Sequence, residues 1–141
     1  MITRLHTVEG ITLDFDSSVP YLLATYTGYA TSQDFRSHCE FGITCVRQKV
    51  AEHGKVAWLT DLRKSEIFME DDVKWTNEYW NVQVYESGLR YFALVMAENI
   101  FAAMNVEEFM EEHKRRKEPL VIKLFSDMES AAAWCREMLA V

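Results

Sequence analysis

Apolar and polar residues alternate in the first part of the chain with the two-residue period of a β-strand. The sequence ITLDFD at residues 11–16 places every second side chain on an apolar face, as in a half-buried strand. Residues 21–28 follow a proline and are rich in residue types that favour strands. Residues 2–8 precede the first of these segments across a Glu-Gly turn. We expect strands at 11–16 and 21–28, with residues 2–8 as an additional partner strand.

The period changes to that of a helix after residue 30. Apolar residues recur there at steps of three and four, which is the spacing of one helix face. The segment begins with TSQD, a variant of the capping box in which Asp replaces Glu or Gln, and Gly54 is suited to end the helix. We expect one helix over residues 31–53, whose buried stripe comprises Phe35, Cys39, Ile43, Val46 and Val50.

Three more apolar segments alternate with amphipathic ones in the rest of the chain. Residues 55–62 and 90–97 are almost continuously apolar, as strands are inside a sheet that is covered on both faces. Residues 120–125 form the last predicted strand. Helices are expected from Glu70 to Glu86, from Asn105 (with Glu108 at the third helical position) to Pro119, and over residues 126–139, where Ser126 and Glu129 have capping-box spacing.

The predicted order is β-β-α-β-α-β-α-β-α within one domain that covers residues 1–141. Strands that alternate with helices indicate an α/β fold, here a single mixed sheet of about five strands with helices packed on it. In such sheets, functional groups gather at the carboxyl ends of the strands. The segment WLTDLRKSEIFMEDD at residues 58–72 is one of those ends.

The chain is acidic, with a formal net charge of −7 from 15 basic and 22 acidic residues. An acidic surface repels nucleic-acid phosphates and anionic lipids, so we expect neither nucleic-acid binding nor membrane docking. Every apolar run is too short to span a bilayer, and the first residues lack the apolar core of a signal peptide, so we expect a cytoplasmic protein. Cys39, Cys45 and Cys135 match no metal or redox spacing and are expected to be buried free thiols.

Recognised motifs for catalysis or metal binding are missing from the sequence, including nucleophile elbows, phosphate-binding glycine loops and paired-histidine zinc motifs. His38 beside Cys39 does not make a catalytic pair, because neighbours on a helix point about 100° apart. A solvated loop and an acidic helix start account for the carboxylates that follow residue 60. We therefore expect no enzyme activity, no cofactor and no metal. Among these acids, Asp61 is the one most suited to a functional role, because it closes an apolar strand.

Three segments resemble those of a known family. They are WLTDLRK at residues 58–64, YFALVMAENIFAAMNVEEF at 91–109 and LFSDMESAAAWCREML at 124–139. Together with the element order, they are similar to the STAS domain of anti-sigma-factor antagonists and more closely to the bacterial SpoIIAA-like proteins. Those proteins are in turn similar to the lipid-binding Sec14 (CRAL-TRIO) fold. The resemblance covers nearly the whole chain and implies a regulatory domain that acts by binding.

The sequence departs from that family at its phosphorylation site. Antagonist STAS domains carry a phosphorylatable Ser at the start of the helix that follows the Asp-Leu pair, where this chain has MED at residues 69–71. Ser65 is the only hydroxyl residue between Asp61 and Thr76, and it lies too early for that match. Carboxylates already supply negative charge here, so a kinase-operated switch is not expected.

The helix predicted after residue 70 has more aromatic residues than one core-facing stripe needs. Trp75 and Tyr79 lie on one side of this helix, and Trp80 lies on another. A helix that packs on a sheet needs one apolar stripe, so the second indicates either a partner surface or incidental exposure beside the core. Residues 98–110 add methionines and phenylalanines, which suit a malleable pocket or a protein groove.

Two binding functions follow from these patterns. The leading hypothesis is a non-catalytic cytoplasmic regulatory or protein–protein interaction module, which associates with itself through residues 75–85 and 100–110. The alternative is a binder of a small apolar or lipid-like ligand in a Sec14-like cavity between the sheet and the helices. The candidate ligand or partner contacts are Asp61, Phe68, Trp75, Tyr79, Trp80, Phe101 and Met104.

Overall fold

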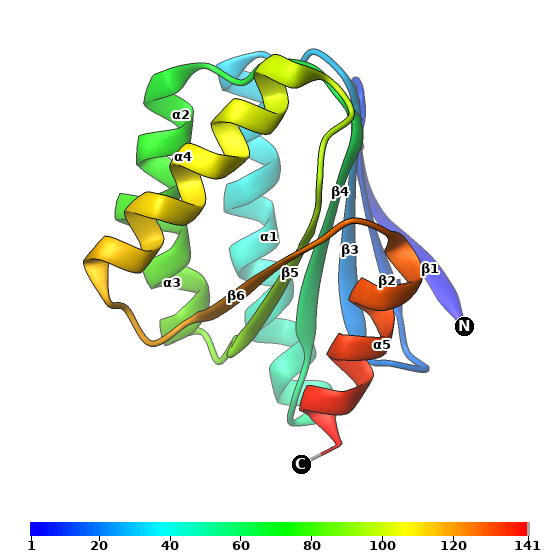
Figure 1. Cartoon of the computed structure of the whole chain (residues 1–141). Helices are drawn as coiled ribbons and strands as arrows, with labels where there is room; N and C mark the ends of the chain where they lie inside the picture. The colour runs from blue at the N-terminus through cyan, green and yellow to red at the C-terminus, as the bar shows by residue number, and fades with distance from the viewer. Residues whose placement is uncertain (141) are drawn as a thin grey trace.

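Every strand of the sheet pairs with its neighbours in the sequence. The computed structural model describes residues 1–140 and contains a six-stranded sheet in the order β1-β2-β3-β4-β5-β6 (Figure 1). The first three strands pair antiparallel, and β3 to β6 pair parallel. The strands are β1 (Ile2–Val8), β2 (Ile11–Asp16), β3 (Tyr21–Gly28), β4 (Ala57–Ser65), β5 (Tyr91–Val95) and β6 (Val121–Phe125).

Helices cover the two faces of this sheet unequally. All the helices that connect parallel strands lie on one face, and the last helix lies on the other (Figure 1). Parallel connections are right-handed, so strands that advance in one direction across a sheet carry their connecting helices on the same side. The helices are α1 (Ser32–His53), α2 (Glu70–Trp75), η1 (Thr76–Trp80), α3 (Asn81–Glu86) and α4 (Ile100–Arg116) on the first face, and α5 (Met128–Leu139) on the second.

The predicted α/β class and the mixed sheet are confirmed. Residues 2–8 form the additional strand, so the sheet has six strands rather than about five. β4 continues past residue 62, the predicted end of this strand, because Ser65 still pairs with Gly28 of β3. The helix predicted over residues 31–53 is also present, with the Thr31 side chain as its N-terminal cap.

The predicted start of the helix that contains Asn105 is wrong. α4 begins at Ile100 rather than at Asn105, because the side-chain oxygen of Asn99 accepts the N–H groups of Phe101 and Ala102. Asn105 therefore lies inside the helix, where its side chain is available for a tertiary contact.

The last helix also begins at a different cap from the one predicted. α5 starts at Met128, and its cap is Asp127, which accepts the Ser130 N–H at 2.7 Å. Ser126 was the predicted cap, but its hydroxyl donates to the Asp127 carboxylate instead. The stronger acceptor of the two neighbouring residues thus occupies the capping position.

A wider turn interrupts the helix predicted from residue 70 to residue 86. The five residues of η1 are π-helical, between the α-helical segments α2 and α3. Two buried amides stabilise this turn: Asn77 Nδ2 donates to the carbonyl of Phe109 in α4, and Asn81 Nδ2 donates to Asn77 Oδ1, both at 3.2 Å. The first of these hydrogen bonds connects the π-helical turn directly to α4, and the second holds the Asn77 side chain in place.

Trp58 of β4 lies at the centre of the core between the sheet and the connecting helices. Its side chain is buried, and its ring centroid lies 5.0 Å from that of Trp80. α1 passes over the indole at Gly42, where a Cβ atom would lie 2.7 Å from Cη2 of Trp58. Real Cβ contacts are essentially never that short. Glycine therefore permits the helix to approach the sheet this closely.

This contact predicts an unusual sign for a helix substitution. Gly→Ala inside a helix normally stabilises by about 1 kcal/mol, but Gly42→Ala forces overpacking against Trp58, which costs about 1–3 kcal/mol. We expect Gly42→Ala to lower the free energy of unfolding measured in urea. In a Trp58→Phe background the same substitution should be neutral or stabilising. A Gly42→Ala protein more stable than the wild type would contradict this account of the packing.

Candidate functional site

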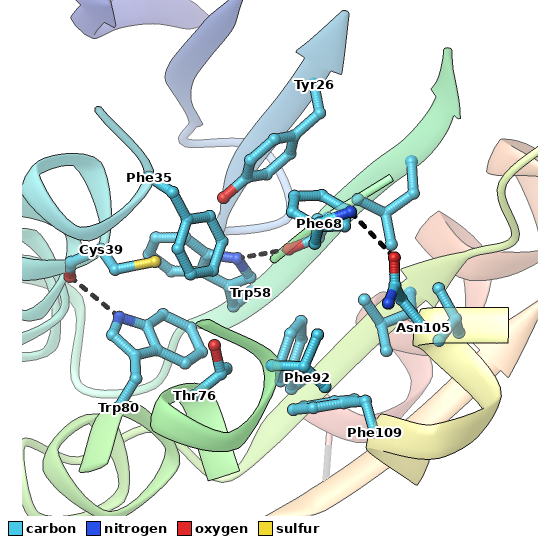
Figure 2. A pocket seen from close by; sticks show the side chains of 15 residues that line it. Tyr26, Phe35, Cys39, Trp58, Phe68, Thr76, Trp80, Phe92, Asn105 and Phe109 are labelled. Atoms are coloured by element: carbon cyan, nitrogen blue, oxygen red, sulfur yellow. Dashed lines mark hydrogen bonds between the residues drawn. The ribbon is translucent and has the colours of Figure 1, made fainter. Parts of the chain in front are cut away.

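A cavity of about 80 Å³ lies between the parallel strands and the helices that cover them. Seven of its fifteen lining residues are aromatic, and they come from β3, α1, β4, the loop after β4, η1, β5 and α4 (Figure 2). The cavity therefore depends on the assembled fold and on residues far apart in the sequence. The lining residues are Tyr26, Phe35, Cys39, Trp58, Thr60, Leu62, Phe68, Val73, Thr76, Trp80, Phe92, Leu94, Asn105, Val106 and Phe109.

The polar groups of this wall are neutral, and most of them are paired. The Trp58 indole N–H donates to the Thr60 hydroxyl at 2.8 Å, and the Trp80 indole N–H donates to the Cys39 carbonyl at 2.9 Å. The Thr76 hydroxyl donates to the carbonyl of Asp72. None of the lining residues carries a formal charge. Because an unpaired charge is costly to bury, this wall favours uncharged occupants.

Three lining residues, Phe68, Thr76 and Asn105, are partly exposed, whereas the other lining residues are buried. They form the mouth of the cavity. The backbone N–H of Phe68 donates to Asn105 Oδ1 at 2.8 Å, which fastens the loop after β4 to α4 (Figure 2). The Phe68 ring packs against those of Tyr26 and Phe35, at centroid distances of 5.4 and 5.6 Å.

The structure brings only two of the seven predicted contact residues to this cavity, Phe68 and Trp80. Phe101 and Met104, predicted as ligand or partner contacts, are 59% and 60% exposed on the first turns of α4 and do not line the cavity. Together with the exposed residues of the neighbouring loops they form what we call the apolar rim. The rim consists of Tyr29 after β3, Ile67 and Met69 after β4, and Ile100, Phe101 and Met104 after β5.

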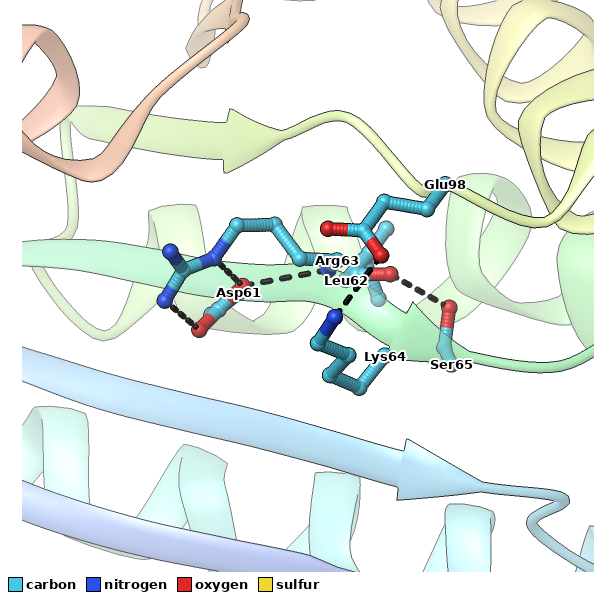
Figure 3. Close-up of polar contacts among 6 residues, drawn as sticks. All are labelled: Asp61, Leu62, Arg63, Lys64, Ser65 and Glu98. Atoms are coloured by element: carbon cyan, nitrogen blue, oxygen red, sulfur yellow. Dashed lines mark hydrogen bonds and ion pairs between the residues drawn. The ribbon is translucent and has the colours of Figure 1, made fainter.

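Asp61 lies on the opposite side of the sheet from the cavity. It shares a face of β4 with Leu59, which belongs to the core under α5, because alternate residues of a strand point to the same side. Its carboxylate accepts the backbone N–H of Arg63 at 3.1 Å and both the Nε and Nη2 groups of that side chain at 3.0 Å (Figure 3). Asp61 therefore neutralises and positions a neighbouring cation at the end of the strand.

Trp75 and Tyr79 are occupied by contacts within the chain. Their rings lie 5.2 Å apart, and the Arg36 guanidinium lies 5.0 Å from the centre of the Trp75 ring. The Tyr79 hydroxyl donates to a carboxylate oxygen of Glu40 at 3.3 Å. The second aromatic stripe of this helix thus packs beside α1, and the first, which includes Trp80, faces the core.

Ser65 is buried, and its hydroxyl donates to the carbonyl of Leu62 at 2.8 Å (Figure 3). The helix start that follows carries Glu70, Asp71 and Asp72 in its first turn, as expected. Asp72 is not solvated as predicted: it is buried and accepts from the Ser32 hydroxyl and from Arg36 Nε. The acid joins the start of α2 to the start of α1.

The predicted burial of the three cysteines is confirmed, and all three are free. Burial raises the pKa of Cys45 to about 11 and that of Cys135 to about 12, and it raises the pKa of Cys39 still further. Thiols with such pKa values stay protonated and unreactive near neutral pH.

The sequence contained usable signals for several cavity residues that our predictions missed. Trp58, Thr60 and Leu62 alternate along β4 and so share one face, and Phe92 and Leu94 do the same on β5. Asn105 was interpreted as a helix cap. A polar residue on the apolar face of α4, one position before Val106, is the signal that marks it.

Comparison of the chain with models of protein families, with curated proteins and with solved structures found no match. Within residues 1–140, no His, Cys, Asp and Glu side chains form a group of three or more that could hold a metal ion. No helix in that part of the chain has both the length and the apolar composition needed to cross a membrane.

His38 lies in the core next to this site with neither ring nitrogen hydrogen-bonded to any group of residues 1–140. Its ring packs edge-on against Tyr26 and Trp58. Burial, together with the nearby His6, lowers the pKa of His38 to about 3. A histidine in an unfolded chain titrates near pH 6.5. Below that pH the unfolded chain therefore binds a proton that the folded chain does not.

We expect His38 to make the protein less stable as the pH falls. Its unfavourable contribution is absent above about pH 6.5 and grows down to the folded pKa, reaching about 2 kcal/mol between pH 7.5 and pH 5. The free energy of unfolding in urea should therefore be lower at pH 5 than at pH 7.5 in the wild type, and this decrease should be smaller by about 2 kcal/mol in His38→Leu. The exposed His53 provides the control: His53→Gln should keep the same pH dependence of stability as the wild type. Equal pH dependence of the wild type and His38→Leu would contradict the prediction.

Proposed function

We propose that the protein is a non-catalytic binder of a small apolar ligand, which occupies the cavity behind Phe68 and Asn105. The observation that carries the proposal is the aromatic, uncharged wall of this cavity beside the carboxyl ends of the parallel strands. Concave apolar sites with a few polar groups are where small ligands bind in most proteins, and open α/β sheets place them at this edge. Of the two functions expected from the sequence, the alternative one is thus the better supported.

The size of the cavity limits what it encloses. An engineered cavity of roughly 150 Å³ accommodates benzene, so about 80 Å³ encloses only a smaller group or part of a ring. A larger ligand would extend through the mouth or displace the Phe68 ring. Phe68 is suited to move, because it lies in the irregular segment between β4 and α2. The exposed apolar rim next to the mouth would then cover the protruding part of the ligand.

Self-association is the second candidate function, and the apolar rim is the observation that favours it. Exposed apolar side chains that gather in one place commonly mark contact surfaces. The sequence pointed to Trp75 and Tyr79 for this role, but their rings are already engaged within the chain. The surface that we propose for a homodimer is instead the start of α4, with Phe101 and Met104.

The wider biological assignment belongs to the same proposal. We propose that the chain is a cytoplasmic, STAS-like or SpoIIAA-like regulatory domain, on the strength of the sequence resemblance and the matching element order. The buried Ser65 and the acidic start of α2 support a version of that domain that works without phosphorylation. In such a domain, occupancy of the cavity would take the place of the phosphate as the regulatory signal.

Ligand binding is tested by filling the cavity. We expect the neutral probe methylenecyclopentane to give saturable NMR shifts of the Trp58 and Trp80 indole N–H groups, which line the cavity, but not of that of Trp134 in α5, on the other face of the sheet. Val106→Phe should abolish these shifts because it fills the cavity from α4. The same substitution at Val121, which is exposed on β6, should leave them intact. Absence of saturable shifts in the folded wild type would refute the proposed function.

Self-association is tested by sedimentation equilibrium. Phe101→Ser should weaken the dimer about tenfold or more, as removal of a contact hot spot does. Trp75→Ala should leave the association constant unchanged and lower the free energy of unfolding, because Trp75 contacts Phe35, Tyr79 and Arg36 of its own chain. A wild-type chain that stays monomeric at every concentration would eliminate this second function.

A further inference from the structure

We propose that the cavity selects a neutral ligand with a hydrogen-bond acceptor, such as a carbonyl or ether oxygen, and that the Asn105 amide receives this acceptor at the mouth. The inference rests on the proposed ligand-binding function and names the chemical class of the ligand. Two hydrogen-bond donors without a partner, the uncharged lining of the cavity and the pairing of the cations around it support the inference.

The first donor is the amide nitrogen of Asn105. Because the Phe68 backbone N–H donates to one side-chain atom of Asn105, that atom must be the oxygen, and the orientation of the amide is determined. The NH₂ group is consequently the other atom, and Figure 2 shows it at the cavity. No acceptor within residues 1–140 is paired with this nitrogen. A ligand oxygen in the mouth would satisfy it.

The second donor lies deeper in the cavity. The Thr60 hydroxyl accepts the Trp58 indole N–H, and its own hydrogen has no acceptor among the described residues 1–140. Thr76 differs, because its hydroxyl hydrogen is engaged by the Asp72 carbonyl. Asn105 and Thr60 therefore each have a hydrogen-bond donor without a partner. An acceptor on the ligand would complement them.

A charged ligand would find no counterpart here. The lining includes no Lys, Arg or His, so a carboxylate or phosphate would be buried without a cation. Three cations from the end of β4 and the start of α1 are already in ion pairs: Arg63 with Asp61, Lys64 with Glu98, and Arg36 with Asp72. Fatty acids and other anions are thus disfavoured relative to neutral molecules of the same size.

Three probes of nearly equal size separate these features. Cyclopentanone and methylenecyclopentane differ only in a carbonyl oxygen against a CH₂ group, and cyclobutanecarboxylate carries a charge. Their affinities for the full chain are measured by NMR titration of the Trp58 and Trp80 indole N–H groups. The side-chain NH₂ resonances of Asn105 are followed in the same spectra, because they report contact with a ligand oxygen in the unmodified protein.

Asn105→Asp is the decisive variant, since it keeps an oxygen for the Phe68 N–H but replaces the NH₂ donor with a second oxygen. We expect it to weaken the binding of cyclopentanone about tenfold and to change the affinity for methylenecyclopentane by less than about twofold. Asn99→Asp places the same charge on the cap of the same helix and should alter neither affinity. The Asn105 NH₂ resonances should shift with cyclopentanone and not with methylenecyclopentane.

Each other outcome overturns a defined part of the inference. If Asn105→Asp weakens the binding of both neutral probes equally, and the Asn105 NH₂ resonances do not shift, the proposed selection for a hydrogen-bond acceptor is refuted. The proposed function would remain intact. A carboxylate that binds as tightly as the ketone would refute the preference for neutral ligands. If no probe binds, the proposed function itself fails. Should Asn105→Asp not fold, the amide resonances of the wild type decide.

Discussion

The contact between Gly42 of α1 and the indole of Trp58 sets how closely the first helix approaches the sheet. With the helix so near, the Trp58 ring cannot tilt away and instead meets Trp80 edge-on, at an interplanar angle of 74°. Phe92 continues the same arrangement towards Phe109. These rings are rigid, and they cannot fold into leftover space as a methionine would. The cavity is what remains between them.

Local periodicity was sufficient to predict the elements and the fold class, but not their exact ends. Alternation identified β2, and a three- and four-residue rhythm identified α1, because each signal lies within a few neighbouring residues. The start of α4 could not be decided in this way. Asn99 and Asn105 are both plausible caps by composition, and the choice depends on the backbone path out of β5. The π-helical turn could not be predicted either, since the buried amide of Asn77 pairs with Phe109, a residue of a helix distant in sequence.

The site was less predictable than the fold, because tertiary packing decides which face of a buried strand is closely packed and which face borders a cavity. The continuous apolar run of β4 showed that both of its faces are covered, and it did not show that a cavity lies on the Trp58 face. The surplus aromatics were correctly recognised as two stripes. Arg36 and Glu40, from the helix next to them, then engage the outer stripe, and such a pairing has no local signature. Asp61, the acid predicted to be most suited to a functional role, instead pairs with the residue two positions later.

The π-helical turn η1 makes the wall of the cavity sensitive to chain length. A π-turn accommodates one more residue than the α-helix around it, and successive helical residues are about 100° apart. Loss of a single residue between Thr76 and Trp80 would restore a regular helix, and α2 and α3 would keep the faces that they present now, because the π-turn absorbs the additional residue. Only the side chains of the turn itself would be rearranged, and this turn contributes Thr76 and Trp80 to the cavity. A one-residue gap at this position in a related sequence would therefore mark a local change in the wall of the cavity within an otherwise conserved fold.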